Sequence, residues 1–473
     1  MKLRDLLKET NSDIEIKDIT CDSRKVKEGS AFICINGNAG DGHDFAQQAV
    51  KSGAVAIICE RDLKLKNQFI VKDARAAFAV MCANYFGNPA DKLKLIGVTG
   101  TNGKTSVTYM LKNSLELLGH KTGLIGTINN LIGEKIIEST NTTPSAYELN
   151  KFFDMMVKEG CEYAVMEVSS HALDQKRVYN LNFEVAIFTN LTQDHLDYHK
   201  TMENYLMAKK KLFYMCKTAV VNADDKYYEE LVKGLKCKIL TYSAVKNDTT
   251  YSAKNITYKP TGVDYEIVSY GLISRVKMKI PGKFTVYNSI AAAICLIDLG
   301  FSVDDVTRTI SSIKGVKGRA EIVPTDTDYT IIIDYAHTPD GLLNILSTFK
   351  DCPKNRLIAV FGCGGDRDKT KRPIMGEIAA RNSDYVIVTS DNPRTEDPSL
   401  IIKDIVVNMK KTRTEYKIIE NRIEAIKYAM QIAKKDDIIV LAGKGHETYQ
   451  IIGKEKIHLD EREVIADILR EKK

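Results

Sequence analysis

The 473-residue chain lacks the marks of several protein classes. Its ten cysteines include no C-x-x-C pair, and no Cys and His residues gather at the spacing of a zinc site. No apolar run approaches the ~20 residues that a membrane helix needs, and the charged N-terminus leaves no apolar core for a signal peptide. We therefore expect a cytoplasmic protein with reduced thiols and no membrane contact.

The sequence also lacks a dense basic tract, repeats and low-complexity segments. The net charge of +6 is small for this length and indicates a mixed surface, with at most a modest bias toward anionic substrates. Three consecutive lysines, Lys209–Lys211, come nearest to a basic arm. We therefore expect no nucleic-acid partner. A prior of about 150 residues per domain predicts about three domains.

Three segments differ in their patterns. Residues 1–93 hold short strands and loops and end at a linker around residues 88–91. In residues 94–318, strand-like runs alternate with helix-like runs, with an antiparallel pattern over 242–279, and residues 319–473 alternate again. We predict an α/β protein with a smaller N-terminal α/β domain, a central domain with a parallel sheet, and a C-terminal Rossmann-like domain. The glycine-rich run at residues 99–106 makes the central one a P-loop ATPase domain.

A glycine-rich turn joins a strand ending at Val98 to a helix that stops at Gly119. Such a turn aims backbone N–H groups and a helix N-terminus at one spot, which suits a polyphosphate. Because Val98 stands where the full motif has glycine, the match is to the shorter G-x-x-G-K-T form. ATP or GTP would bind to Gly100, Thr101, Asn102, Gly103, Lys104, Thr105 and Ser106, with Lys104 on the outer phosphates and the Thr105 hydroxyl on Mg²⁺.

Polar residues follow the next strands. Glu167 ends an apolar strand and is a candidate Mg²⁺ ligand, or else pairs with a surface lysine. His195 lies in a polar cluster after the following strand and could bind a second Mg²⁺, or else is solvated. Lys209 belongs either to a solvated basic helix face or, as a carbamate, to a metal site, since an unmodified ammonium would be repelled by Mg²⁺.

Three charged loops follow three strands of the last segment: Gly362–Lys369, Asp391–Arg394 and Gly443–Glu447. They can converge on one ligand beyond the carboxyl ends of the strands, or they are ordinary loops. Arg367 and Arg394 offer planar forks for carboxylates, and Glu447 offers an anion for an ammonium. The set suits an amino acid with more than one carboxylate.

Four motifs occur in the order seen in the Mur ligases, the ATP-dependent amino-acid-adding enzymes of peptidoglycan synthesis. They are Thr99–Thr105, Glu167–His171, Asp334–His337 and Gly443–Glu447, and the chain resembles this family over nearly its whole length. The resemblance implies ATP and Mg²⁺ as cofactors. It adds Asn288, Arg319 and Asp334 to the nucleotide contacts, and it makes Thr105, Glu167, His195 and carbamylated Lys209 the metal ligands. With Lys104, the last three would be the catalytic residues.

The resemblance also implies two substrate sites. Ser23, more loosely Asn38–Gly40, and then Asn141, Thr142, Thr143, Ser169, Gln175 and Arg177 would hold a UDP-linked muramoyl dipeptide. The incoming amino acid would bind to Arg367, Asp391, Asn392, Pro393, Arg394, Gly443 and Glu447. Closure of the domains around a hinge near residues 315–318 would then bring the three substrates together.

Arg394 favours meso-diaminopimelate as the amino acid, because a guanidinium pairs with its distal carboxylate and repels the lysine ammonium. The expected reaction joins diaminopimelate to the D-Glu γ-carboxylate of UDP-MurNAc-L-Ala-D-Glu through an acyl phosphate. The alternatives are a lysine-adding Mur ligase, a folylpolyglutamate-synthase-like ligase and, outside enzymes, a nucleotide-switched binding protein. The expected partners are small-molecule substrates, and the chain is expected to be a monomer.

Overall fold

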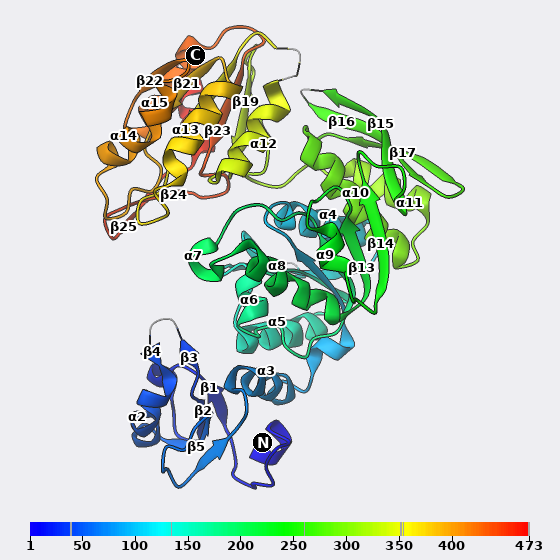
Figure 1. Cartoon of the computed structure of the whole chain (residues 1–473), viewed down its shortest axis with the longest axis vertical. Helices are drawn as coiled ribbons and strands as arrows, with labels where there is room; N and C mark the ends of the chain where they lie inside the picture. The colour runs from blue at the N-terminus through cyan, green and yellow to red at the C-terminus, as the bar shows by residue number, and fades with distance from the viewer. Residues whose placement is uncertain (38–39, 134, 260, 351, 353, 472–473) are drawn as a thin grey trace.

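Three sheets follow one another along the chain (Figure 1). The computed structural model describes residues 1–37, 40–133, 135–259, 261–350, 352 and 354–471. The N-terminal sheet lies at one end, the largest sheet in the middle and the C-terminal sheet at the other end. Each sheet falls within one of the ranges predicted as domains, whose boundaries remain predictions. None of the described helices combines the length and the apolar character needed to cross a membrane.

The N-terminal sheet has four parallel strands in the order β1-β2-β5-β6. Its elements are β1 (Asp18–Thr20), β2 (Ser30–Ile33), β5 (Ala54–Cys59), β6 (Gln68–Ile70), the pair β3 (Asn36–Gly37) and β4 (Gly40–Asp41), α1 (Leu3–Leu6), α2 (Ala46–Lys51) and α3 (Ala74–Tyr85). The sequence pattern predicted only short strands and loops in this segment, and it did not predict α3. The alanine-rich face of α3 is buried, and Asp73 caps its N-terminus. Asn38 and Ala39 of the predicted uridine pocket lie outside the described residues.

The central sheet has the order β10-β9-β8-β11-β7-β12-β13-β14-β15-β16-β17. Its strands are β7 (Lys94–Thr99), β8 (Thr122–Ile125), β9 (Asn129–Ile132), β10 (Lys135–Glu138), β11 (Tyr163–Glu167), β12 (Phe183–Phe188), β13 (Cys216–Asn222), β14 (Lys238–Ser243), β15 (Tyr251–Lys259), β16 (Gly262–Ser269) and β17 (Leu272–Met278). In this order, the neighbouring strands from β8 through β11, β7, β12, β13 and β14 to β15 run parallel. The expected antiparallel strands, β15 to β17, form one edge of the sheet. The antiparallel pair at the other edge, β9 with β10, was not expected from the sequence.

Helices cover both faces of the central sheet, and its apolar side chains alternate between two buried clusters (Figure 1). In β7, Ile96 and Val98 pack on one face while Leu95 packs on the other, as the period of a strand requires. The helices are α4 (Lys104–Leu117), α5 (Ala146–Lys158), α6 (Ser170–Asp174), α7 (Leu196–His199), α8 (Met202–Lys210), α9 (Tyr228–Val232), α10 (Lys283–Asp298) and α11 (Val303–Ser312).

The C-terminal sheet has the order β18-β19-β23-β20-β21-β22, parallel except for β18. Its elements are β18 (Glu321–Val323), β19 (Thr330–Asp334), β20 (Leu357–Phe361), β21 (Tyr385–Val388), β22 (Glu415–Ile418), β23 (Ile438–Ala442), the hairpin β24 (Tyr449–Ile452) and β25 (Glu455–His458), α12 (Pro339–Lys350), α13 (Lys371–Asn382), α14 (Pro398–Met409), α15 (Arg422–Ile432) and α16 (Glu461–Glu471). This order sets the carboxyl ends of β19, β23, β20 and β21 side by side, so the loops that follow them meet.

A buried ion pair fixes α15 to α16 beneath that edge. Arg422 donates through Nε to Glu461 Oε1 at 2.8 Å and through Nη2 to the Ala442 carbonyl at 2.9 Å, where β23 ends. Both side chains are almost wholly buried. The charge of Glu461 raises the pKa of Arg422 against the lowering effect of burial.

We expect Glu461→Ala to lower the free energy of unfolding of the C-terminal part by about 3–5 kcal/mol, because Arg422 would stay buried without its counter-ion. Urea denaturation followed by circular dichroism measures the change. Glu471→Ala is the control, since Glu471 pairs with Lys427 at the surface and its loss should cost little. Equal losses in both variants would contradict the expectation.

Candidate active site

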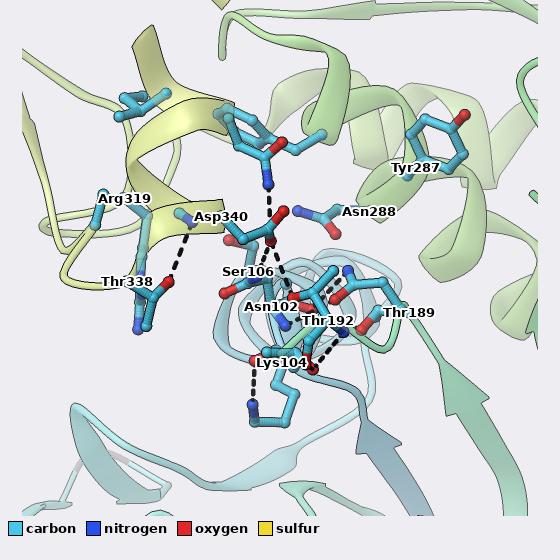
Figure 2. A pocket seen from close by; sticks show the side chains of 18 of the residues that line it. Asn102, Lys104, Ser106, Thr189, Thr192, Tyr287, Asn288, Arg319, Thr338 and Asp340 are labelled. Carbon is cyan, nitrogen blue, oxygen red and sulfur yellow. Dashed lines mark hydrogen bonds between the residues drawn. The ribbon is translucent and has the colours of Figure 1, made fainter. Parts of the chain in front are cut away.

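A cleft of about 830 Å³ lies between the carboxyl edge of the central sheet and the first helix of the C-terminal sheet. Figure 2 shows side chains from both parts pointing into it. Its walls come from the loop before α4, the loop after β12, α10, and the residues that follow β19 into α12. The cleft is lined by every predicted nucleotide residue except Gly100: Thr101, Asn102, Gly103, Lys104, Thr105, Ser106, Asn288, Arg319 and Asp334.

The phosphate loop is held against the loop after β12. Thr101 N–H donates to the Asn190 carbonyl at 2.8 Å, and Asn102 N–H donates to Asn190 Oδ1 at 2.9 Å. Gly103 has a φ of +88°, and a Cβ there would lie 2.5 Å from Asn288 Oδ1, so α10 approaches the loop too closely for a side chain. The loop is therefore held in place by contacts with the protein itself.

Two ammonium groups converge on one carbonyl oxygen of this loop. Lys104 Nζ donates to Gly100 O at 3.0 Å, and Lys209 Nζ donates to the same oxygen at 2.8 Å. Burial lowers the pKa of both lysines, and the neighbouring charge of Lys104 takes the pKa of Lys209 well below its usual value. A buried and a half-buried cation that share a neutral acceptor make a site for anionic groups.

The three adjacent lysines have different surroundings. Lys209 is 1% exposed, and its Nζ also lies 4.5 Å from the centre of the Tyr205 ring. Lys210 is buried as well but turns to the Glu230 and Lys233 carbonyls, whereas Lys211 is at the surface and pairs with Asp174. The interpretation as a solvated basic helix face is therefore wrong for Lys209 and Lys210. Of the three lysines, Lys209 alone reaches the phosphate loop.

Glu167 is the buried acid of the site. Its Oε1 accepts from Thr105 Oγ1 at 3.0 Å and from Thr127 N–H at 2.8 Å, and its Oε2 accepts from Thr127 Oγ1 at 3.0 Å. The hydroxyl and the carboxylate predicted as Mg²⁺ ligands are therefore in contact. The alternative that Glu167 pairs with a surface lysine is wrong, since the side chain is 1% exposed at the end of β11.

His195 lies on the cleft wall with a left-handed φ of +53°. Its ring stands edge-on to that of His171, 4.9 Å away between centres. Its side chain is 47% exposed, and its Nε2 lies 3.4 Å from Asp194 Oδ2. Partial desolvation lowers the pKa of His195 against the raising charge of Asp194, and the neighbouring His171, Lys104 and Lys209 lower it further, which favours the neutral imidazole. Within the described residues, no group of three or more His, Cys, Asp and Glu side chains gathers at metal-binding distance.

The predicted muramoyl-dipeptide residues of the central sheet form one network next to Glu167. Thr143 Oγ1 donates to the Glu167 carbonyl at 2.8 Å and accepts from Ser169 N–H at 2.9 Å. Arg177 Nη1 donates to the Thr143 carbonyl at 2.7 Å, and its Nη2 donates to Gln175 Oε1 at 2.7 Å.

The other residues predicted for this substrate lie around that network. Thr142 lines the cleft and Asn141 is exposed beside it. Ser23 begins a short 3₁₀ turn of the N-terminal part and does not line the cleft.

The loops predicted for the amino acid converge around a lysine that sequence reasoning did not single out. Lys444 is fully buried, and its Nζ donates to Asn392 Oδ1 at 2.6 Å. The same ammonium lies 3.1 Å from Glu447 Oε2 and 3.3 Å from Asp391 Oδ1. Gly443 has a φ of +117°, which favours glycine, and a Cβ there would lie 2.6 Å from Asp391 Oδ2.

The arginines of these loops are less enclosed. Arg394, after Pro393, has a φ of +52° and donates through Nη1 to the Gly365 carbonyl at 2.7 Å. Arg367 is exposed and donates to the Asp366 carbonyl. Like the other residues predicted for the amino acid, neither lines the 830 Å³ cleft.

Tyr335 joins this region to the cleft. Its ring lies 4.8 Å from the Arg319 guanidinium and 4.9 Å from the His446 ring. Arg319 in turn donates to Thr105 Oγ1 at 3.4 Å. Asp334 accepts from Ala320 N–H and Ala336 N–H, and burial raises the pKa of its carboxyl group.

Family models match three parts of the chain. Residues 98–296 match the Mur ligase middle domain, residues 318–445 match the Mur ligase glutamate ligase domain, and residues 15–85 match the catalytic domain of the Mur ligase family. The chain belongs to the Mur ligase family. The family and the three-domain α/β fold expected from the motifs are thereby confirmed.

Known Mur ligases match along nearly the whole chain. The UDP-N-acetylmuramoyl-L-alanyl-D-glutamate–2,6-diaminopimelate ligase 1 of Clostridium acetobutylicum is 51% identical, over 97% of this chain and 95% of that protein. The ligase of the same name from Bacillus cereus is 46% identical, over 96% of this chain and 94% of that protein. A solved structure of such a ligase superposes with a TM-score of 0.72 at 34% identity, covering 97% of this chain and 95% of that one.

More distant structures share the fold. The MurF ligase of Thermotoga maritima in complex with ADP is 20% identical with a TM-score of 0.63, and it covers 97% of each chain. Folylpolyglutamate synthase of Mycobacterium tuberculosis is 17% identical with a TM-score of 0.63 and covers 76% of this chain.

Four residues of this Mur ligase site were missed from the sequence: Thr127, Tyr335, Asp340 and Lys444. Lys444 and Tyr335 stand inside motifs that were quoted, so their position was available although their contacts were not. Thr127 and Asp340 carry no local signal, because each acts through a partner far away in the sequence.

We expect Glu167→Gln to weaken Mn²⁺ binding in the presence of ADP about tenfold or more, because an amide removes the charge next to Thr105. Electron paramagnetic resonance of Mn²⁺ measures the affinity. Glu162→Gln is the control, since Glu162 lies one residue before β11 and pairs with His120 at the surface. Unchanged Mn²⁺ affinity in Glu167→Gln would remove Glu167 from the metal site.

Proposed function

We propose that the chain is an ATP-dependent ligase that joins 2,6-diaminopimelate to UDP-MurNAc-L-Ala-D-Glu in peptidoglycan precursor synthesis. The observation that carries this proposal is the 51% identity with the Clostridium acetobutylicum ligase over 97% of the chain. A reaction that consumes ATP and a UDP-linked substrate belongs in the cytoplasm. Residues 1–93 would hold the UDP part, residues 94–318 ATP and the dipeptide, and residues 319–473 the amino acid.

The reaction forms an amide bond in two steps. The γ-carboxylate of D-Glu attacks the γ-phosphorus of ATP, ADP leaves, and an acyl phosphate forms. The neutral amine of diaminopimelate then attacks the acyl carbon, phosphate leaves, and the amine loses a proton. Lys104 and the loop amides would stabilise the charge on the transferred phosphoryl group.

The contact between Thr105 and Glu167 supports a divalent cation beside the phosphate loop. Thr105, Glu167, the neutral imidazole of His195 and a carbamate on Lys209 would hold Mg²⁺, which supplies positive charge to the phosphates when bound. The lowered pKa of Lys209 leaves a neutral amine that can add to CO₂. The Nζ–C bond forms, the nitrogen loses one proton, and the neutral amine becomes an anionic carbamate.

The dipeptide would lie along the network of Thr143, Ser169, Gln175 and Arg177, which begins at the main chain of Glu167. In this position the carboxylate substrate would lie next to the phosphate loop. The distal carboxylate of diaminopimelate would pair with Arg394, and its ammonium with Asp391 and Glu447.

A product assay that offers diaminopimelate, lysine and ornithine side by side tests the function. We expect product with diaminopimelate, and phosphate release that requires both the UDP-linked dipeptide and the amino acid. Product with lysine alone would make the chain a lysine-adding ligase. Phosphate release with ATP alone would favour a nucleotide switch.

We expect Lys209→Ala to abolish product formation, because the site loses its carbamate. Short-chain carboxylates should partly restore activity to this variant, since they supply the missing anion. Lys211→Ala is the control from the same run of lysines and should stay active. Full activity of Lys209→Ala would end the carbamate proposal.

We expect Arg394→Ala to raise the KM for diaminopimelate about a hundredfold or more while the Kd for ATP changes little, because a charged pair in a selective site is lost. Steady-state kinetics and nucleotide titration measure the two constants. Arg413→Ala, at the surface of the same domain, is the control. An unchanged KM for diaminopimelate would remove the main support for this substrate.

A further inference from the structure

Two arginines from different parts of the chain lie within reach of each other's charge, where the N-terminal part meets the central part. Arg75 belongs to the first turn of α3, and α3 packs against α5 of the central part (Figure 1). Arg177 follows α6 and belongs to the hydrogen-bond network next to Glu167. Burial lowers the pKa of Arg177, and the charge of Arg75 lowers it further, so the two guanidinium groups repel each other.

The residues next to these arginines form an ion pair that fixes the junction. Lys176 Nζ donates to Asp73 Oδ2, and Asp73 also caps α3 by accepting from Ala76 N–H at 2.8 Å. Asp73 lies two residues before Arg75, and Lys176 lies directly before Arg177. The ion pair therefore holds the start of α3 against the turn after α6, and it keeps the two arginines near each other.

The hydrogen-bond acceptors of both arginines are neutral oxygens. Arg75 Nη2 donates to the Asn36 carbonyl at 2.6 Å. Arg177 donates to the Thr143 carbonyl and to Gln175 Oε1, each at 2.7 Å. These contacts orient the two guanidinium groups but leave their charges uncompensated.

The acids near the two arginines have partners of their own, which are Arg24 for Asp22, Lys176 for Asp73 and Lys211 for Asp174. Glu148, whose charge acts on Arg177, accepts from Ser145 at the start of α5. Among the residues that the structure describes, neither Arg75 nor Arg177 forms an ion pair. The junction therefore carries two positive charges that suit an anionic group.

Arg75 also lies between the two regions proposed for the UDP-linked substrate. Its partner Asn36 stands at the start of the short strand pair that includes Gly40 of the predicted uridine pocket. Burial raises the pKa of Cys21, two residues before Ser23, and the charge of Arg75 lowers it. Burial likewise raises the pKa of Tyr198, next to the dipeptide network, and the charge of Arg75 again acts in the opposite direction.

We propose that Arg75 is a substrate-binding residue that forms, together with Arg177, a clamp for one oxyanion of the UDP-linked substrate. The proposal rests on the proposed function, which supplies that substrate. Guanidinium forks match the oxygens of phosphate and carboxylate groups, and an anion between two like charges relieves their repulsion. The substrate carries both kinds of oxyanion, in its diphosphate and in its dipeptide, and the two sources differ in what the variants below do to UDP binding.

Calorimetric titration of the full chain with UDP-MurNAc-L-Ala-D-Glu tests the proposal. Arg75→Gln should weaken binding about tenfold or more, because a hydrogen bond between two charged groups is lost. The Kd should also rise less steeply with salt than in the unchanged chain, since one charge no longer contributes to binding. Arg4→Gln is the control, because Arg4 pairs with Asp13 at the surface of the same part, and it should change neither quantity.

Titration with UDP alone separates the two sources of the oxyanion. A clamp on the diphosphate predicts that Arg75→Gln weakens UDP binding by the same factor as it weakens substrate binding. A clamp on a dipeptide carboxylate predicts unchanged UDP affinity. Unchanged affinity for the full substrate would overturn the proposal, and so would weaker binding with an unaltered salt dependence, which indicates a role in packing only.

A double-mutant cycle checks that both arginines hold the same group. The loss of affinity in the Arg75→Gln and Arg177→Gln double variant should be smaller than the product of the two single losses, because an anion released by one side chain lies more loosely against the other. Losses that multiply would mean that the two arginines act on separate groups, and they would overturn the clamp.

These outcomes are separable from those of the product assay. Product with lysine instead of diaminopimelate would overturn the proposed function and leave the effect of Arg75 on dipeptide binding intact. Product with diaminopimelate, together with a substrate affinity that Arg75→Gln does not change, would overturn the clamp alone.

Discussion

The buried carboxylate of Glu167 holds the two halves of the central site together. Its oxygens accept from Thr105 at the start of α4 and from Thr127 after β8, and its own carbonyl accepts from Thr143. A buried carboxylate without hydrogen-bond donors would be costly, so these partners are fixed as a set. The nucleotide loop and the proposed dipeptide network thus share one anchor, which sets their spacing before either substrate binds.

The site also concentrates cations where anions are expected. Lys104 and Lys209 share the Gly100 carbonyl. Lys444 lies between the carboxylates of Asp391 and Glu447 and the side-chain amide of Asn392, which is 52 residues away along the chain. Lys444 is neutralised by its neighbours, whereas the first two have only a neutral acceptor in common. Burial and the charge of Lys104 together take the pKa of Lys209 well below its usual value, so the region beside the phosphate loop favours bound anions.

Local patterns predicted most of the architecture. The polar loops of the site follow strands such as β11, β20 and β23. The sequence predicted these strands because each is a short apolar run followed by glycine or charged residues. The alanine-rich α3 and the pair of β9 with β10 were missed, since weak amphipathic patterns and short edge strands leave little trace in a sequence.

The residues of the candidate site likewise differ in whether a local pattern predicts them. Residues inside motifs, such as Glu167, could be found, but Thr127 and Asp340 could not, because their roles arise from partners 40 residues and 238 residues away. The three lysines at 209–211 show the limit most clearly, since they are identical in type, yet Lys209 and Lys210 are buried with different partners and Lys211 is exposed.

Communication between the nucleotide and amino-acid regions needs a physical connection, because the amino-acid loops do not line the cleft. Tyr335 supplies one: its ring contacts both the guanidinium that reaches Thr105 and the His446 ring beside Glu447. Gly318, whose φ is +71°, packs so tightly on that loop that a Cβ would lie 2.1 Å from His446 N. Gly318 is therefore fixed to the C-terminal sheet, and any hinge in the 315–318 segment must bend before it. Rotation there would move Arg319, Tyr335 and the amino-acid loops as one unit relative to the phosphate loop.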